Sequence, residues 1–324
     1  MKAFIQSTGY YVPDYIRTNE ELSSMVDTND EWIYSHTGIR ERRIAGPDQA
    51  ASDLAVEASL KAIEKAAISA DDIDIIILAT STPDHNSFPS TASLVQDKLG
   101  ARNAAAMDIS AACSGFAYAL ETGKNFIASG SYKHVLVIGT EVFSRIIDWT
   151  DRDTCVLFGD GAGAVVLSQQ EKEESYILDS ILGSDGSGAP YLIREAGGSR
   201  YPKNETDKSP FVTMNGRRVY NFAVKVIGKT ILDLLDRNNY TIDDIDYIVP
   251  HQANIRIIEA CAKRTGIPLE KFFTDMEFYA NTSAASIPIA LGEMEEKGLL
   301  HRGNLIITVG FGAGLTYAGN LLRW

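Results

Sequence analysis

The stretch ADDIDIIILATSTPDH, residues 70–85, has a counterpart later in the chain, IDDIDYIVPHQAN, residues 242–254. Each copy is an acidic turn, then a short β-rich run, then a loop that contains proline and histidine. A segment with apolar residues at helical spacing precedes each copy, at residues 51–68 and 219–238. This faint internal repeat predicts two similar α/β units.

Two further pairs of segments continue the repeat: a small-residue turn that opens a helix, and a final buried strand. The pairs are AACSGFAYAL (111–120) with NTSAASIPIAL (281–291), and HVLVIGTE (134–141) with NLIITVGFG (304–312). Strands that alternate with helices indicate parallel or mixed sheets with helices on their faces. We therefore expect two similar α/β halves, residues 1–174 and 175–324, packed together.

Composition excludes several classes of protein. The 324 residues suit two fused domains with a sizeable core, and the net charge of −13 argues against a nucleic-acid partner. The three cysteines have no disulfide or zinc spacing, and no apolar run is long enough for a signal peptide or a membrane span. We expect a protein of the reduced cytosol, without a membrane partner or a bound metal.

Cys113, His251 and Asn281 are the candidates for chemistry. The repeat predicts equivalent points for Cys113 and Asn281, where a strand passes into a helix, and His251 is predicted to follow another strand. Because ligands of open α/β sheets bind at the carboxyl ends of strands, we expect the three to face one cleft. The alternative is three unrelated loop residues.

Each candidate also has a structural interpretation. A helix N-terminus lowers a cysteine pKa, which favours a nucleophile at Cys113, but a buried packing residue is the commoner case. His251 is either a donor or base, or a surface histidine, and Asn281 is either an oxyanion donor or a helix N-cap. The other cysteines illustrate packing: Cys155 is predicted inside a strand, and Cys261 on the inward face of a helix.

Two glycine-rich runs and one basic stripe complete the candidates. FGDGAGAVVL (158–167) lacks a full dinucleotide fingerprint and predicts a turn entering a strand, whereas GFGAGLTYAG (310–319) offers backbone amides to a bound carbonyl. The residues that share one helix face after His251 are Arg256, Lys263 and Arg264. In an acidic protein this face is a candidate for an acidic partner, and a solvated helix face is the alternative.

Taken together, these motifs resemble the β-ketoacyl-acyl-carrier-protein synthase III family of the thiolase superfamily, along essentially the whole chain. The matching stretches are TNDEWIYSHTGIRERRI (28–44), SFPSTA (87–92), DISAACSGF (108–116), TDRDTCVLFGDGAGAVVL (150–167), VPHQANIRII (249–258), NTSAAS (281–286) and GFGAGLTYAG (310–319). The resemblance implies an α/β fold, a thiolase-like duplicated five-layer α-β-α-β-α sandwich with mixed sheets, and a homodimer.

The resemblance also implies a role for individual residues. The implied sets are catalytic Cys113, His251 and Asn281; the oxyanion backbone of Cys113, Gly312 and Ala313; a coenzyme A groove at Trp32, Arg152 and Asn254; an acyl pocket at Phe88 and Phe311; and carrier docking at Arg256, Lys263 and Arg264. Phe88 would reach the pocket of the partner subunit. His36 and Asp153 depart from the family pattern in the presumed groove, so nucleotide affinity is expected to differ there.

The implied reaction starts fatty-acid synthesis. A short acyl group, expected to be acetyl, passes from acyl-CoA to Cys113, and malonyl on acyl carrier protein then loses CO₂ and condenses with it to give 3-oxoacyl carrier. No cofactor is implied, because CO₂ departure supplies the carbanion. The alternatives are a related ketide synthase with another primer or extender, a Cys-His-Asn acyl-CoA hydrolase, and a non-catalytic member of the fold.

Overall fold

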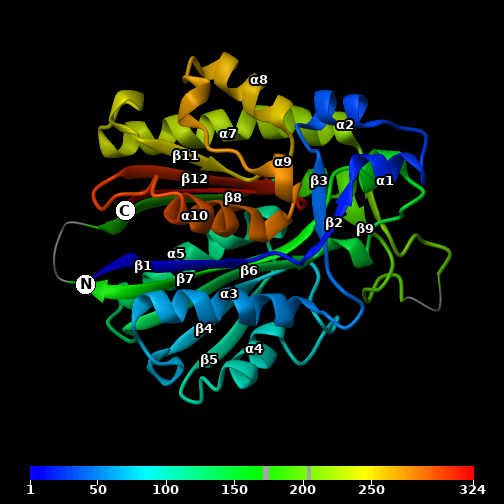
Figure 1. Ribbon diagram of the computed structural model, residues 1–324. Coiled ribbons are helices and arrows are strands. Elements are labelled where there is room, and N and C mark those ends of the chain that lie inside the picture. Colours follow the sequence, from blue (N-terminus) through cyan, green and yellow to red (C-terminus); the bar gives the residue numbers. More distant parts are fainter. Residues whose placement is uncertain (171–174, 203–205) are drawn as a thin grey trace.

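The computed structural model describes residues 1–170, 175–202 and 206–324, and two mixed sheets form its centre (Figure 1). The strands of the first sheet are β1 (Lys2–Tyr11), β4 (Ile75–Ala79), β5 (Ala105–Ile109), β6 (His134–Val142) and β7 (Asp160–Gln170). The strands of the second are β8 (Tyr176–Ser184), β11 (Tyr247–Pro250), β12 (Leu305–Gly312) and β13 (Thr316–Arg323). Two short antiparallel pairs are β2 (Tyr15–Thr18) with β3 (Glu41–Ile44) and β9 (Leu192–Arg194) with β10 (Val212–Met214).

The two sheets share one plan. The first has the order β1-β7-β6-β4-β5, and the second has the order β11-β12-β13-β8. Strand β4 runs parallel to β5 and β6, while β7 is antiparallel to both its neighbours. In the second sheet β11 is parallel to β12, and β13 is antiparallel to its neighbours.

Helices make three layers around these sheets. The α-helices are α1 (Asn19–Ser23), α2 (Asp30–Thr37), α3 (Ala51–Ala66), α4 (Thr91–Leu99), α5 (Gly115–Ala128), α6 (Arg152–Cys155), α7 (Gly216–Asn238), α8 (Ile255–Thr265), α9 (Met276–Tyr279) and α10 (Ser286–Glu296). The 3₁₀ turns are η1 (Ala70–Asp72), η2 (Ala112–Ser114), η3 (Phe143–Arg145), η4 (Gly186–Tyr191), η5 (Ile242–Asp244), η6 (Leu269–Lys271) and η7 (Ser283–Ala285). None of these described helices combines the length and apolar character needed to span a bilayer.

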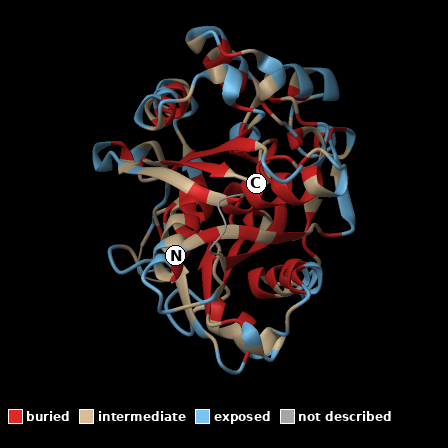
Figure 2. Ribbon diagram, turned by 90° about the vertical axis from the view of Figure 1, so that its left-hand side faces the viewer, coloured by how far each residue is buried: buried red, intermediate tan, exposed pale blue. Residues whose placement is uncertain are grey.

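The layers alternate as α-β-α-β-α. Helices α3 and α4 cover the outer face of the first sheet, α5 and α10 lie between the sheets, and α7 and α8 cover the second sheet (Figure 1). Every residue of α10 from Ser286 to Met294 is buried, and Figure 2 shows buried residues concentrated in the sheets and the central helices. The predicted five-layer sandwich with mixed sheets is confirmed.

Most predicted elements occur where the periodicity placed them. The segments 51–68 and 219–238 contain α3 and α7, and Cys261 is fully buried on α8. The expectation for Cys155 was wrong: it ends the short helix α6, because the Asp151 carboxylate accepts hydrogen bonds from Asp153 N and from the Thr154 hydroxyl and so starts a helical turn. The boundary at 174 lies outside the described residues, and the division into 1–174 and 175–324 stays a prediction.

The structure corrects the register of the repeat. Turn η2 precedes α5 as η7 precedes α10, and each begins with a left-handed residue, Ala112 at φ 47° and Ser283 at φ 49°. Cys113 is therefore equivalent to Ala284, and Asn281 lies three residues before that point. Short runs of small residues match one another in several registers, so the sequence alone did not distinguish them.

Candidate active site

One cavity of about 610 Å³ collects the predicted site residues at the carboxyl ends of the strands. The sequence-predicted residues that line it are Trp32, Cys113, Arg152, His251, Asn254, Arg256, Asn281, Phe311 and Gly312. They come from segments far apart in the chain, so the fold brings the expected cleft together. The alternative of three unrelated loop residues does not describe this arrangement.

Cys113 lies at the bottom of this cavity, in η2 just before α5, and is 5% exposed. Burial raises the pKa of its thiol to about 12, because the charged thiolate would lose its hydration there. Desolvation of the thiolate therefore opposes the lowering of the pKa that we expect from the helix N-terminus. The resting thiol is therefore protonated, and its proton must be removed as it attacks.

Gly312 closes against Cys113 so tightly that no side chain fits there. A Cβ at Gly312 would lie 2.7 Å from the Cys113 nitrogen and 3.2 Å from Sγ. Since only glycine permits this approach, the backbone at the end of β12 runs directly beside the thiol. Ala313 follows in the turn between β12 and β13 and lines a smaller cavity on another side of Cys113.

His251 is a buried side chain, not a surface histidine. It follows β11, its backbone N–H donates to Val309 O at 2.8 Å, and its ring packs edge-on against Phe311 with centroids 5.1 Å apart. Nδ1 lies 2.7 Å from the Ser286 hydroxyl. Burial lowers the pKa of the imidazole to about 3, so the resting ring is neutral.

Asn281 is held by both its backbone and its side-chain carbonyl. Its N–H donates to Leu157 O and its C=O accepts from Gly159 N, at 2.9 and 3.0 Å. Its Oδ1 accepts from Ser283 N at 2.9 Å, so the side chain forms a local turn with its own chain and is not the N-cap of α10. No described residue accepts from Nδ2, which leaves the amide N–H groups available to a bound oxygen.

The mouth of the cavity is built by α2 and the start of α8. The Trp32 ring stacks on His36 with centroids 4.5 Å apart, and the Arg152 guanidinium lies 5.0 Å from the Trp32 ring. Asn254 donates to His36 O, and Arg256 donates to Ser35 O. These contacts fix a flat aromatic surface beside a positive charge, and His36, which departs from the family pattern, is part of that surface.

The small cavity beside the thiol has a volume of about 110 Å³. Phe143 and Phe158 stack at 4.7 Å and form one of its walls. Phe311, predicted for an acyl pocket, instead lines the large cavity beside His251, because its ring packs on the imidazole. Phe88 is 84% exposed and lines none of the cavities described here.

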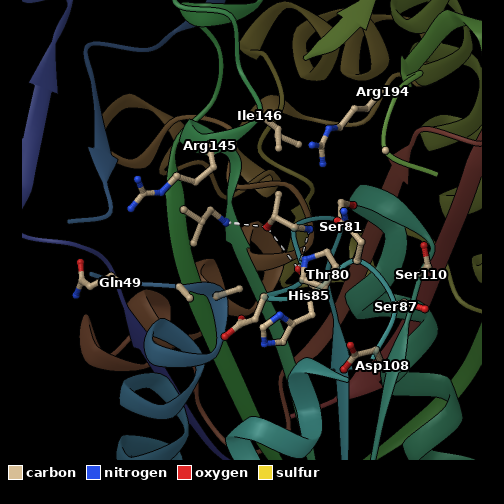
Figure 3. A pocket seen from close by; sticks show the side chains of 18 of the residues that line it. Gln49, Thr80, Ser81, His85, Ser87, Asp108, Ser110, Arg145, Ile146 and Arg194 are labelled. Carbon is tan, nitrogen blue, oxygen red and sulfur yellow. Dashed lines mark hydrogen bonds between the residues drawn. The ribbon is translucent and has the colours of Figure 1, made fainter. Parts of the chain in front are cut away.

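A further cavity, of about 700 Å³, adjoins the small one and is shown in Figure 3. Ser81, Ile146 and Arg194 line both, so the two are adjacent. Figure 3 shows Arg145, Ile146 and Arg194 along its upper side, and Ser87, Asp108 and Ser110 at its lower right. It contains none of the three candidate catalytic side chains.

The basic stripe is exposed on α8. Arg256 sits at the cavity mouth, and Lys263 and Arg264 lie in the last helical turn, where the helix dipole also favours cations. Lys263 is seven residues along the helix from Arg256, roughly 10 Å at 1.5 Å per residue. The stripe therefore leads away from the cavity mouth along one helix face.

Sequence reasoning missed several residues of the site. Arg217 lines the cavity mouth from α7, Ser286 contacts His251, and the buried Glu141 carboxylate accepts from Ser81 N and the Thr82 hydroxyl. Arg217 belongs to no motif or spacing pattern of the sequence, and the motif NTSAAS, which ends at Ser286, does not by itself indicate a contact of that hydroxyl with His251. Glu141 ends the predicted strand 134–141, and a carboxylate after an apolar run was the available signal for it.

Comparisons with known proteins agree with this architecture. Two family models match: 3-oxoacyl-[acyl-carrier-protein] synthase III over residues 107–186, and its C-terminal model over residues 235–324. A β-ketoacyl-[acyl-carrier-protein] synthase III of Caldanaerobacter subterraneus subsp. tengcongensis is 53% identical, with 99% of this chain and 98% of that protein covered. A crystal structure of 3-oxoacyl-[acyl-carrier-protein] synthase III from Aquifex aeolicus is 44% identical with a TM-score of 0.92, covering 99% of this chain and 100% of that one.

A crystal structure of the priming β-ketosynthase from the R1128 polyketide biosynthetic pathway is also similar. It is 36% identical with a TM-score of 0.92, and 99% of this chain and 96% of that chain are covered. The duplicated sandwich with a buried cysteine in a shared cavity thus defines a thiolase-like condensing enzyme. More narrowly, the chain belongs to the 3-oxoacyl-[acyl-carrier-protein] synthase III family, and it is an acyltransferase that carries out the initiating condensation of fatty-acid synthesis.

Proposed function

We propose that this enzyme transfers a short acyl group, acetyl, from acyl-CoA to Cys113 and condenses it with malonyl-acyl carrier protein. The observation that carries the proposal is the meeting of Cys113, His251 and Asn281 in one cavity. The products are 3-oxoacyl carrier, coenzyme A and CO₂. No metal or cofactor takes part in these steps, because loss of CO₂ supplies the carbanion.

In the first half-reaction Cys113 attacks the thioester carbon. Trp32 and Arg152 at the cavity mouth hold the nucleotide end of coenzyme A, with Asn254 beside them. The tetrahedral oxyanion is stabilised by backbone N–H groups of Cys113 and of the Gly312–Ala313 turn. The small volume of the cavity beside the thiol, about 110 Å³ against about 610 Å³ for the large cavity, supports a short acyl group.

In the second half-reaction malonyl on its carrier loses CO₂ and becomes an enolate. The Asn281 amide donates to the enolate oxygen, and His251 stabilises the same charge. The carbanion attacks the acyl carbon, and Cys113 leaves. The acidic carrier docks on Arg256, Lys263 and Arg264, which are exposed beside the cavity.

Mass spectrometry of the protein incubated with acetyl-CoA tests the proposal. An acetyl group is expected on the peptide that contains Cys113, and addition of malonyl carrier is expected to remove it with release of CO₂. Acetylation elsewhere, or none at Cys113, overturns the assignment. The variant Cys261→Ala is the matched control, because Cys261 is buried on α8 and lines none of the described cavities.

A ketide synthase with another primer is the second candidate, favoured by the similarity to the priming β-ketosynthase. A panel of straight and branched acyl-CoA primers with malonyl carrier separates the two. A Cys-His-Asn hydrolase, in which the amide orients the imidazole, is disfavoured. Here the partner of His251 is Ser286, and the carbonyl of Asn281 is engaged by Ser283 N.

The proposal includes a cytoplasmic homodimer. Strand β5 is an edge strand of its sheet with a half-exposed face, and Phe88 projects on a nearby loop with 84% of its surface exposed. An unpaired strand edge and an exposed aromatic side chain are features that a second copy covers. Light scattering is expected to give twice the mass of one chain, and Phe88→Asp to weaken both association and acylation.

A further inference from the structure

The partner of His251 is a single buried hydroxyl at the start of the central helix. Ser286 is the first residue of α10 and is 2% exposed, as is His251. Its Oγ lies 2.7 Å from His251 Nδ1, 2.9 Å from Ser283 O and 3.4 Å from Gln252 N. A hydroxyl has one proton and two lone pairs, so these three contacts use its capacity fully.

The directions of these hydrogen bonds follow from the groups themselves. The Ser283 carbonyl can only accept, so Ser286 gives its proton there, and the Gln252 N–H can only donate. One lone pair of Ser286 therefore remains for His251, and the bond forms when Nδ1 carries a hydrogen. The opposite ring nitrogen, Nε2, then has a lone pair on the side away from Ser286.

We propose that Ser286 is a positioning residue that keeps the proton of neutral His251 on Nδ1, so that Nε2 acts as the proton acceptor for Cys113. The assignment deepens the acyl transfer proposed above and rests on it. Burial keeps the resting thiol protonated and the resting imidazole neutral. The thiol therefore needs a base at the moment of attack, and the neutral imidazole can be that base.

The protons then balance through both half-reactions. As Sγ bonds to the acyl carbon, the thiol proton moves to Nε2, and the coenzyme A sulfur takes that proton when its C–S bond breaks. The second half-reaction consumes one proton, which Nε2 takes from a hydronium ion of the solvent. Nε2–H then donates a hydrogen bond to the enolate oxygen, and it gives the proton to the Cys113 sulfur when the bond between that sulfur and the acyl carbon breaks. Throughout, Nδ1–H stays on Ser286.

The variant Ser286→Ala distinguishes control of the His251 tautomer from a contribution of Ser286 to packing alone. In Ser286→Ala an Nδ1–H would be a buried donor without a partner, which costs more than a buried lone pair, so the ring shifts toward Nε2–H. That tautomer keeps a donor for the enolate but lacks a base for the thiol. We expect acetylation of Cys113 to fall by about tenfold or more relative to CO₂ release from enzyme already acylated.

The control is Ser59→Ala, which removes another buried hydroxyl that donates to a backbone carbonyl, Ala55 O, in α3. Both half-reaction rates are expected to stay unchanged in this variant. Equal losses in both half-reactions of Ser286→Ala would show a merely structural role and overturn the proposal.

Nitrogen NMR of the free enzyme gives a direct reading. With ¹⁵N-labelled histidine, the five histidines are resolved by long-range proton–nitrogen correlation, and His251→Gln assigns the one of interest. A protonated Nδ1 in the unaltered protein, and a shift toward Nε2–H in Ser286→Ala, are expected. An Nε2–H tautomer in the unaltered protein overturns the proposal, whereas a failure to acetylate Cys113 counts against the acyl transfer and leaves this measurement intact.

Discussion

The turns η2 and η7 have similar backbones, but they contribute different side chains to the active cavity. Both contain a left-handed residue, both open a helix between the two sheets, and the two turns lie against each other. At equivalent positions the first turn carries Cys113 and the second carries Ala284. The first half supplies the nucleophile, and the second supplies His251 and Asn281.

This difference shows what a duplicated fold provides. The repeated backbone places two similar turn–helix corners, η2–α5 and η7–α10, against one another, and side chains then divide the chemistry between them. The place of Asn281 in the first half is taken by Ser110, which lines the cavity in Figure 3 and not the thiol cavity. The two halves are therefore alike in geometry, while the active cavity draws a different set of side chains from each.

Cys113→Ala makes the two turns alike and has the largest expected effect. Acyl transfer from acyl-CoA is expected to vanish, because no other residue of the cavity replaces the thiolate. The free energy of unfolding is expected to change by about 1 kcal/mol, as for a modest buried truncation. Acyl-enzyme formation and urea unfolding measure the two quantities, and residual acylation at the normal rate would contradict the assignment.

Asn281→Ala removes the donor that the second half contributes. We expect CO₂ release from malonyl carrier to fall about 10²–10³-fold, the usual cost of losing one oxyanion donor. Acetylation of Cys113 should fall much less, because Asn281 acts on the enolate. Asn281→Asp keeps the size and the acceptor for Ser283 N but lacks the amide hydrogens, so recovery of activity in that variant would argue against the donor role.

The sequence predicted the layers because periodicity and repetition report on burial, which the fold must satisfy. It predicted Cys113 and His251 after the ends of strands, where the structure has β5 and β11, whereas Asn281 follows helix α9 and pairs with Phe158 only through an isolated bridge. It did not predict the thiol pKa or the place of Phe311, because both depend on how completely neighbouring segments exclude water. Ser286 was missed for the same reason: its partner is 35 residues away and meets it only after folding.

Substitution of Glu141 tests a buried carboxylate that accepts hydrogen bonds from Ser81 N and the Thr82 hydroxyl. Burial raises the pKa of this carboxyl to about 7, although hydrogen bonds from Thr82 and Ser81 lower it. The folded protein therefore binds a proton that the unfolded chain releases above its ordinary pKa, so stability from this group is present below about pH 4.5 and is lost as the pH rises through about 7. Glu141→Gln is expected to gain on the order of 2 kcal/mol relative to the unaltered protein between pH 5 and pH 8, by urea unfolding. A difference that is flat with pH would show that the carboxyl does not titrate in this range.

Lys263→Glu sharpens the comparison at the surface, where helix α8 of the second half carries the basic face that begins at the cavity mouth with Arg256. Lys263 lies away from the cavity lining, so acetylation of Cys113 by acetyl-CoA is expected to stay unchanged. The KM for malonyl carrier is expected to rise about threefold to tenfold, because one charge at the edge of a docking surface mainly affects association. High salt should shrink the difference, since it screens exposed charges. Lys133→Glu is the control, because Lys133 is an exposed lysine just before the amino end of β6, whereas the cavity lies at the carboxyl ends of the strands. An equal effect of this variant would mean that net charge, not the α8 face, governs carrier binding.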